Sequence, residues 1–544
     1  MARRRRGRSG SPPAAAPSAA PRAALVAGVL FVLAAALRLL RWAIAGERSA
    51  PFDPAYPGDS QLWVDWARAI RAGVPYELDL PLHPPGTAYL AAWLGGEASR
   101  LRVVWCLLGA AGVALFYLAI RRSFGARAAL GAGLGAAFAT SSILLATSID
   151  SEAPYLVLVA ASFLFLPDDS EARPARGRLV AWGALQGVAC LFRVEHALFA
   201  GLVGLWWVGR WLRRGDPAPA VAGRVAIAAA AAAATLLPWH VTAWRDVARL
   251  NREPPVLAPA EAAAYAAVEA RTAHLLWDES ARRWRDALPA FARRPAALFV
   301  AATAAHRGRR VVGAAEVAAL EEAFGATPRP LPERFFVSIY GPLNFALAHD
   351  DGTGGRFSTH RLELPPPLAG GARRYPPELV AGLPPPELAL SYPPHLALVL
   401  DGYRVGGRWI LDHPAQFVRA SARKLARFWE GAASGLGPTG LPAGLAAPRR
   451  VDVAAHRPGL VAILWQFVIL ALVVAGAWRA GRRPALAPWW FYLGSKLAVT
   501  VLFFGYARQG ALVVPVVALL ATLAFVTPAA AGASASMPRR ERSS

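Results

Sequence analysis

The sequence predicts an all-α polytopic membrane protein with about ten transmembrane helices, amphipathic helices in its outer loops and a large extracytoplasmic segment. Of its 544 residues, 55% are hydrophobic and only 17% are charged, and the mean hydropathy is +0.34. The apolar residues come in blocks of roughly 20, the length that crosses the hydrocarbon core of a bilayer. A soluble protein of this size would carry more charge and would lack such long apolar blocks.

The formal net charge of +24 raises the alternative that the chain binds nucleic acid. Its arginines lie mostly in short segments between the apolar blocks, where they act as topology signals. The run Arg3-Arg4-Arg5-Arg6 belongs to a basic N-terminal tail that we expect to be disordered and cytoplasmic. No folded basic domain follows this run, so nucleic acid is not an expected partner.

The ten predicted spans agree with the positive-inside rule. With a cytoplasmic N-terminus, the arginine clusters fall on one side of the membrane, which places both termini in the cytoplasm and the chain in the plasma (inner) membrane. The first span contains Arg38 and Arg41, and these arginines favour an uncleaved anchor over the alternative of a cleaved signal peptide. The spans lie near residues 23–45, 100–120, 128–147, 152–167, 179–195, 196–212, 224–245, 459–478, 485–504 and 509–527.

The spans divide the chain into five regions. The long segment between the seventh and eighth spans is rich in proline and charge, contains amphipathic helical stretches at 259–294 and 407–430, and is long enough to form a small outer domain. The predicted regions are a cytoplasmic tail at 1–22, an N-terminal transmembrane domain at 23–246 with the outer loop 46–99, an extracytoplasmic domain at 247–458, C-terminal spans at 459–527 and a cytoplasmic tail at 528–544.

The first outer loop places an acid at the membrane surface. Asp59 is followed by Leu62, Trp63, Trp66 and Ile70 at helical spacing. This pattern predicts a short helix that lies in the interface with its aromatic face in the lipid headgroups. Asp59 is then either the cap of this helix or a catalytic base tuned by partial loss of hydration.

A second helix is predicted after His83-Pro84-Pro85, over residues 88–94. Proline suits the first turn of a helix, and the unpaired N–H groups at a helix N-terminus attract phosphate. His83 is therefore a candidate phosphate ligand, with a structural helix start and a surface histidine as the alternative.

These residues resemble a known group. Asp59, the aromatic residue four positions later and the Pro-Pro roughly 25 residues on are similar to the first outer loop of the C-type membrane glycosyltransferases. The likeness is greatest to glycosyltransferase family 39, the protein O-mannosyltransferase-like group, which includes the aminoarabinose transferases that modify lipid A. His83-Pro84-Pro85 matches the His-Pro-Pro or Lys-Pro-Pro of those enzymes.

Further motifs extend this resemblance from about residue 25 to 527. Two departures matter: Trp63 stands where tyrosine is common in the group, and the second acid is either Asp150 or Glu152. The further motifs are Ser148-Ile149-Asp150-Ser151-Glu152, Leu237-Pro238-Trp239-His240, Gly341-Pro342-Leu343-Asn344-Phe345, Gly354-Gly355-Arg356-Phe357, His413-Pro414 leading to Lys424-Leu425-Ala426-Arg427-Phe428-Trp429, and Gly505-Tyr506-Ala507-Arg508-Gln509.

The resemblance implies an enzyme that transfers a sugar, with inversion, from a polyprenyl-phosphate donor to a hydroxyl of an acceptor glycan, lipid or protein on the extracytoplasmic face. Asp59 would be the general base in an N-terminal catalytic domain, and Asp150 or Glu152 would be the second catalytic acid. Cations must hold the charge of the leaving phosphate. The candidates are His83, Arg38, Arg193 and Arg508, with snorkelling to the headgroups as the alternative for each arginine.

Asp59 and Asp150 are also candidate ligands of a divalent cation, Mg²⁺ or Mn²⁺, because hard cations prefer carboxylate oxygen. No ligand spacing in the sequence demonstrates such a site. The alternative function is a multi-span transporter or flippase of a lipid-linked or anionic solute, which needs ionisable residues near mid-membrane and paired broken helices. The charged residues here cluster at the outer ends of the spans and no internal repeat is evident, which favours the transferase.

Overall fold

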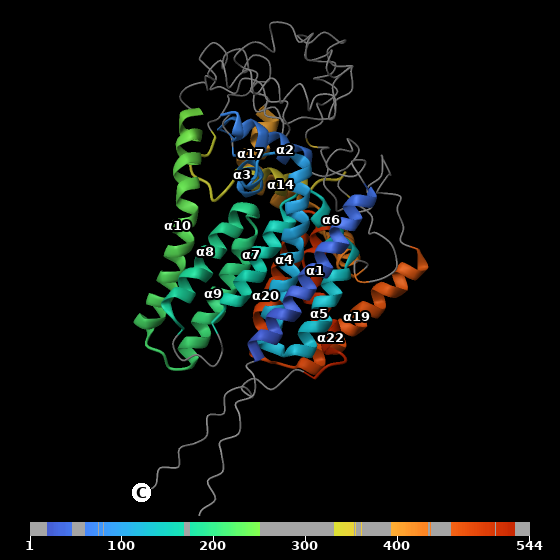
Figure 1. Cartoon of the computed structure of the whole chain (residues 1–544). Helices are drawn as coiled ribbons and strands as arrows, with labels where there is room; N and C mark the ends of the chain where they lie inside the picture. Colours follow the sequence, from blue (N-terminus) through green and yellow to red (C-terminus); the bar gives the residue numbers. More distant parts are fainter. Residues whose placement is uncertain are drawn as a thin grey trace, which may run out of the picture.

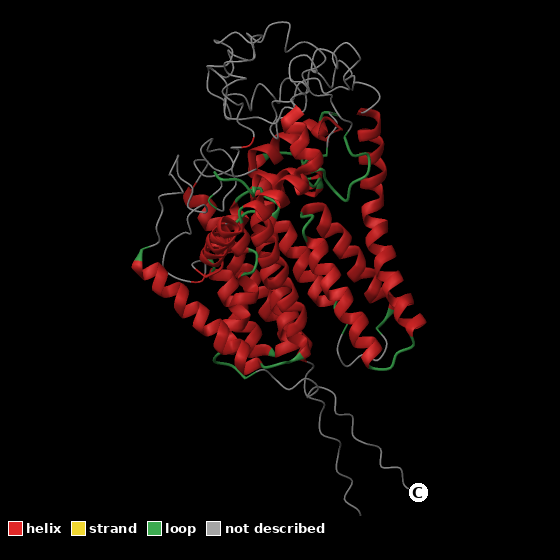
Figure 2. Ribbon diagram, turned by 180° about the vertical axis from the view of Figure 1, so that it is seen from behind, coloured by secondary structure: helices red, strands yellow, loops and turns green. Residues whose placement is uncertain are grey.

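The computed structural model describes residues 19–45, 60–73, 76–79, 81–167, 174–250, 331–352, 354, 361, 393–433, 436, 459–505 and 507–527. Asp59, with the rest of 46–59, lies outside the described residues, as do the stretch at 259–294 and the tails at 1–18 and 528–544. Within the described residues the chain is helical and contains no strand (Figures 1 and 2).

The described helices fall into two groups along the chain, before and after residue 250. Up to residue 250 they are α1 (Ala19–Ala45), α2 (Ser60–Arg71), η2 (Tyr76–Asp79), α3 (Gly86–Trp93), α4 (Ala98–Phe124), α5 (Ala126–Phe138), α6 (Thr140–Thr147), α7 (Glu152–Phe165), α8 (Arg176–Phe192), α9 (His196–Arg213) and α10 (Ala218–Leu250). After it they are α14 (Tyr340–Leu347), α17 (Pro393–Asp412), α18 (Pro414–Ala433), α19 (Leu460–Ala480), η5 (Pro484–Leu486), α20 (Ala487–Leu502), α21 (Ala507–Ala511) and α22 (Val514–Leu523).

Four described helices are long and apolar enough to cross a membrane. They are Pro21–Ile44 in α1, Ala98–Phe124, Ala218–Arg249 and Leu460–Ala480. The pair α5 and α6, bent by 56° at Ala139, would make a fifth. Each predicted span coincides with a helix or with neighbouring short helices, but α7 and α22 are only 14 and 10 residues long. A multi-helix membrane architecture is therefore supported, and the count of ten spans stays a prediction.

The long helices pack into a bundle with a cap of short helices at one end (Figure 1). Neighbouring helices contact one another in the order α10, α8, α7, α4 and α1, and α5 joins α4 to the pair α22 and α19. At the centre of the bundle, Phe163 stacks on Trp489 with ring centroids 4.0 Å apart, and Phe116 and Phe199 surround the pair. The cap of α2, α3, α14 and α17 lies over this aromatic core.

The predicted helix after Asp59 is present as α2, but its aromatic face does not lie in the headgroups. Trp63 and Trp66 are only 4% and 2% exposed and belong to a buried cluster with Trp105. The face is covered because α3 packs directly against α2. Helical periodicity identified the apolar face correctly, but that face contacts protein.

Helix α18 and the short helix α21 meet backbone to backbone. A Cβ atom on Gly431 would lie 1.8 Å from the carbonyl oxygen of Ala507, and one on Gly510 would lie 1.8 Å from that of Phe428. A Cβ on Gly505 would likewise lie 2.2 Å from the Cα of Lys424. These glycines let α21 approach α18 closely and so fix the position of the residues that α21 carries.

We therefore expect Gly431→Ala to destabilise the chain by roughly 1–3 kcal/mol, since the added methyl group overlaps a backbone atom that cannot rotate away. Gly407→Ala in α17 is the matched control, because nothing lies within 4 Å of a Cβ at that position. Thermal unfolding of both purified variants measures the effect. Equal melting temperatures would contradict the close contact.

Lys424 of α18 is fully buried and donates a hydrogen bond to the Val501 carbonyl at 3.1 Å. Burial lowers the pKa of Lys424 from 10.5 to about 8. Between these two pH values the unfolded chain binds one more proton at this residue than the folded chain, so folding stability rises with pH. Relative to that of Lys424→Met, the free energy of unfolding of the wild type should rise by roughly 3 kcal/mol between about pH 8 and pH 10.5. A pH-independent difference between the two proteins would show that Lys424 stays charged.

Candidate active site

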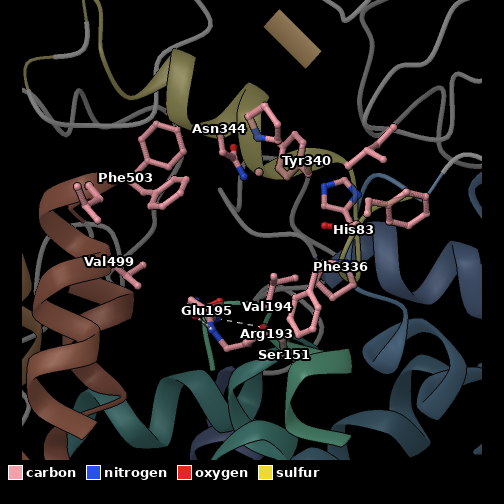
Figure 3. A pocket seen from close by; sticks show the side chains of 18 of the residues that line it. His83, Ser151, Arg193, Val194, Glu195, Phe336, Tyr340, Asn344, Val499 and Phe503 are labelled. Carbon is pink, nitrogen blue, oxygen red and sulfur yellow. Dashed lines mark hydrogen bonds and ion pairs between the residues drawn. The ribbon is translucent and has the colours of Figure 1, made fainter. Parts of the chain in front are cut away.

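A cavity of about 1500 Å³ lies between the helical cap and the ends of the bundle helices. Its walls come from the first outer loop, the α7 start, the α8–α9 turn, the outer segment and the α20–α21 turn. In Figure 3, Ser151, Arg193 and Glu195 lie on one side, Tyr340 and Asn344 lie on the other, and His83 lies at the edge between them. The cavity is thus lined by residues from the predicted N-terminal transmembrane domain, the extracytoplasmic domain and the C-terminal spans.

Glu152, the first residue of α7, is the centre of the polar wall. Its side chain is fully buried, and an unpaired carboxylate in such a place is costly. Arg193 donates to it from Nη1 at 2.8 Å, and Arg508 donates from Nε at 2.5 Å and from Nη2 at 3.2 Å. Glu152 therefore brings together two of the predicted phosphate-binding arginines.

Asp150 lies on the same wall, at a longer distance. Its Oδ1 is 3.5 Å from Nη2 of Arg508, and its side chain is 1% exposed. Trp105 on α4 donates its indole N–H to the Asp150 carbonyl oxygen at 2.6 Å, which fixes the turn before α7. Both candidate acids thus face Arg508, and Glu152 accepts two hydrogen bonds from it.

Arg193 makes two further hydrogen bonds. Its Nε donates to Glu195 at 2.5 Å and its Nη1 to the Ser151 hydroxyl at 3.1 Å. Lys496 of α20 donates to the same Glu195 oxygen at 3.2 Å and lies 4.5 Å from the Tyr155 ring centroid. A second acid and a third cation therefore extend the network into the bundle.

Glu195 and Lys496 were not among the residues predicted from the sequence. Lys496 did carry a signal, because it is one of only two lysines in the chain and sits inside an apolar stretch, where a charge calls for a partner. His196 is a satisfied buried residue, with Tyr155 at 3.0 Å from Nδ1 and Gln186 at 2.8 Å from Nε2.

His83 forms the edge of the cavity through a contact that the sequence did not predict. Glu77 of η2 accepts the His83 backbone N–H at 2.9 Å and lies 2.5 Å from ring Nδ1. The imidazole lies between the rings of Trp63 and Tyr340, with centroids 5.7 and 4.8 Å away. Helix α3 begins at Gly86, as the two prolines predict, and His83 points away from it into the cavity.

Arg38 does not join this cluster. It is 1% exposed, donates to the carbonyl of Ala34 one turn earlier at 3.0 Å, and packs against Gly109 of α4. It is not among the residues that line the cavity. The helical phase of α1 turns this side chain toward α4, although its depth along the span is that of the outer end.

The predicted divalent cation is only partly testable on the described residues. No three histidine, cysteine or acidic residues in the described ranges lie close enough together to bind a metal ion. Of the predicted pair, Asp59 lies outside those ranges, and Asp150 has the Arg508 guanidinium beside it where a cation would have to bind. The metal stays a prediction, and no chemical step below depends on it.

The strip 335–339 of the outer segment is anchored at the cavity wall by α10. Trp239 donates to the Val337 carbonyl at 2.8 Å, and Trp244 donates to that of Phe335 at 2.9 Å. On the other side, the Ile339 N–H donates to the Pro81 carbonyl at 2.9 Å. The Pro-Trp motif at 238–239 thus positions the strip that leads into α14.

The cavity-lining residues His83 to Glu195 fall within the segment that matches a known family. Residues 82–239 match the family model described as dolichyl-phosphate-mannose-protein mannosyltransferase. No curated protein matches the chain.

Two solved structures show a weak likeness. The archaeal oligosaccharyltransferase AglB from Archaeoglobus fulgidus, in complex with an inhibitory peptide and a dolichol-phosphate, has 13% identity and a TM-score of 0.38 over 92% of this chain and 50% of that one. ArnT from Cupriavidus metallidurans, bound to undecaprenyl phosphate, has 15% identity and a TM-score of 0.32 over 93% of this chain and 78% of that one. The chain thus spans about half the length of AglB, and TM-scores this low do not bear on function.

The family match covers the His-Pro-Pro motif, both candidate acids, Arg193 and the Pro-Trp motif. It confirms, over residues 82–239, that this chain is similar to the C-type membrane glycosyltransferases.

Proposed function

We propose that the chain is an integral-membrane glycosyltransferase that moves a sugar, with inversion, from a polyprenyl-phosphate donor to an acceptor hydroxyl on the extracytoplasmic face. The observation that carries this proposal is the meeting of Arg193 and Arg508 on Glu152 at the wall of a large cavity that also exposes His83. The family match over residues 82–239 supports it.

The paired arginines suit the leaving group of this reaction. As the bond between the anomeric carbon and the phosphate oxygen breaks, negative charge grows on the phosphate, and preorganised donors stabilise it. An arginine offers five N–H donors in a planar fork that matches phosphate oxygens. Glu152 fixes the direction of both forks before the donor arrives, so little reorganisation is needed on binding.

Glu152 is therefore better suited to positioning than to taking a proton. Its two oxygens accept three N–H bonds from arginines, and a carboxylate so engaged is a weak base. We assign the base role to Asp59 and propose Asp150, which lies 3.5 Å from Arg508, as the second acid. The acceptor hydroxyl gives its proton to Asp59 as its oxygen attacks the anomeric carbon.

The rest of the cavity suits the other parts of the two substrates. Apolar side chains such as Phe336, Leu400, Val499 and Phe503 line it together with the polar wall, and they match the first isoprene units of a lipid carrier. Tyr340 and Asn344 of the outer segment face Arg193 across the cavity (Figure 3). We propose that the extracytoplasmic segment 247–458 covers the site and helps to select the acceptor.

Asp59→Asn should fold and bind donor but lower sugar transfer by about 10²–10⁴-fold, because the amide cannot take the hydroxyl proton. The measurement is transfer of labelled sugar from a polyprenyl-phosphate donor in membranes that contain the wild type or the variant. Full activity of the variant would show that Asp59 is not the general base. Uptake of donor by proteoliposomes without any glycosylated product would favour the transporter instead.

Arg508→Lys should weaken donor binding and transfer by at least about tenfold, since lysine keeps the charge but cannot make both bonds to Glu152 and a fork to phosphate. Arg224→Lys is the matched control, because Arg224 pairs with Asp216 at 2.5 Å and does not line the cavity. Affinity for polyprenyl phosphate is measured on both variants in nanodiscs. Equal losses in the two variants would mean that Arg508 does not bind the phosphate.

A further inference from the structure

We propose that Glu77 is a positioning residue that holds the His83 imidazole as a protonated N–H donor for the phosphate of the polyprenyl-phosphate donor. This inference rests on the proposed function and adds a residue to it. Glu77 does not touch the substrate in this scheme, and it acts only through His83.

The first argument is the bonding of the Glu77 carboxylate. One oxygen accepts the His83 backbone N–H at 2.9 Å, and the other lies 2.5 Å from ring Nδ1. In the proposed arrangement Glu77 is an ionised carboxylate that accepts at both oxygens, so the proton between Glu77 and the ring lies on Nδ1. This fixes the tautomer and leaves Nε2 as the atom whose protonation can change.

The second argument is the environment of the ring. Glu77 is 1% exposed, so its charge is poorly screened by water and acts strongly on the imidazole. In the described part of the chain the ring is faced by Glu77 from η2, by the Trp63 indole from α2 and by the Tyr340 phenol at the start of α14. The other charged groups on the cavity wall are Arg193, Glu195, Arg508, Glu152, Arg334 and Arg427.

The third argument is the backbone. Glu77 has a φ of +47°, and it is the only non-glycine residue in the described ranges with a positive φ. A side chain with a Cβ rarely adopts this conformation and keeps it only where its surroundings demand it. Glycine would adopt this conformation with less strain. We therefore infer that the position needs the carboxylate of Glu77. Pro84 restricts the His83 backbone in turn, because a residue before proline is held in the extended region.

The consequence is a proton coupled to donor binding. Next to an ionised carboxylate, Nε2 takes up a proton from solvent and then donates an N–H to a phosphate oxygen. Without the carboxylate, neither the positive charge of the ring nor its tautomer is stabilised, and a neutral imidazole offers the phosphate at most one uncharged N–H donor. Glu77 therefore extends the pH range over which His83 can bind the donor.

The test is the affinity of full-length protein in nanodiscs for undecaprenyl phosphate between pH 5.5 and pH 9. Glu77→Gln should bind roughly tenfold more weakly than wild type at pH 7.5 because the charge-assisted donor is lost, and the ratio of the two affinities should move toward one as the pH falls to 5.5. Taking the ratio cancels the titration of the phosphate itself. Glu97→Gln, a change to an exposed acid before α4, is the control and should leave the profile unchanged.

Two further variants separate charge from structure. Glu77→Gly fits the positive φ and should reproduce the pH-dependent loss of Glu77→Gln if the carboxylate matters. In a His83→Lys background, Glu77→Gln should change affinity less than about twofold, because lysine is charged without help. A loss that is equal at every pH, or one that persists with His83→Lys, would overturn the proposal.

The outcomes also distinguish this proposal from the proposed function. If the wild type neither binds undecaprenyl phosphate nor transfers sugar, both the proposed function and the proposed role of Glu77 are wrong. A wild type that transfers sugar, with a Glu77→Gln variant of unchanged pH profile, would remove the role of Glu77 alone.

Discussion

The burial of the Glu152 carboxylate between two arginines is the constraint on which the candidate site depends. A buried charge must be paired within hydrogen-bond distance or it destabilises the fold by several kcal/mol. The pairing here joins chain segments 41 and 356 residues away, at Arg193 and Arg508. Arg508 lies on α21, which rests on α18 through the close contacts at Gly431 and Gly510. The position of Arg508 in the wall therefore depends on the packing of the C-terminal helices, and we expect these glycines to matter to the site as well as the arginines.

A second consequence concerns the outer segment. The strip 335–339 is tied to α10 by two tryptophan N–H groups and to the first outer loop by a backbone bond at Pro81. His83 follows that loop bond by two residues and contacts Tyr340, so the histidine and the strip 335–339 are joined through the same loop. Under the proposal that the extracytoplasmic segment covers the site, an acceptor that displaces this strip would also move His83. The proposal thus links acceptor entry to the geometry around the donor phosphate.

The sequence predicted the parts of the site that depend on local pattern and motif order. Helix positions followed from apolar blocks, and Arg193 and Arg508 from their predicted places near the outer interface. His83 was identified from the helix start after it and from the family resemblance, and Glu152 from the resemblance, as an alternative to Asp150. The direction in which a side chain points was harder to predict. Arg38 has the right depth but faces α4, and the aromatic face of α2 contacts α3 because periodicity does not say whether an apolar face meets lipid or protein. Glu77 had no signal at all, since its role arises from a backbone conformation and a contact that no spacing encodes. Asp59 stays a prediction, as it lies outside the described residues.

The charge balance of the wall explains why a titratable histidine belongs beside it. In the described ranges Asp150, Glu152 and Glu195 meet Arg193, Lys496 and Arg508, three acids and three bases in mutual contact. This cluster is thus balanced in charge before any donor binds, and a phosphate that reaches it must share arginines that are already paired, while Arg334 and Arg427 line other parts of the cavity. Binding at the cluster alone would leave an uncompensated negative charge in a partly desolvated cavity, which is costly. A proton taken up by His83 compensates that charge without loosening the arginines from Glu152, and it can leave again once the phosphate departs. A fixed cation at residue 83 would bind the donor as well but would also retain the product phosphate, so a histidine whose charge can be lost suits turnover.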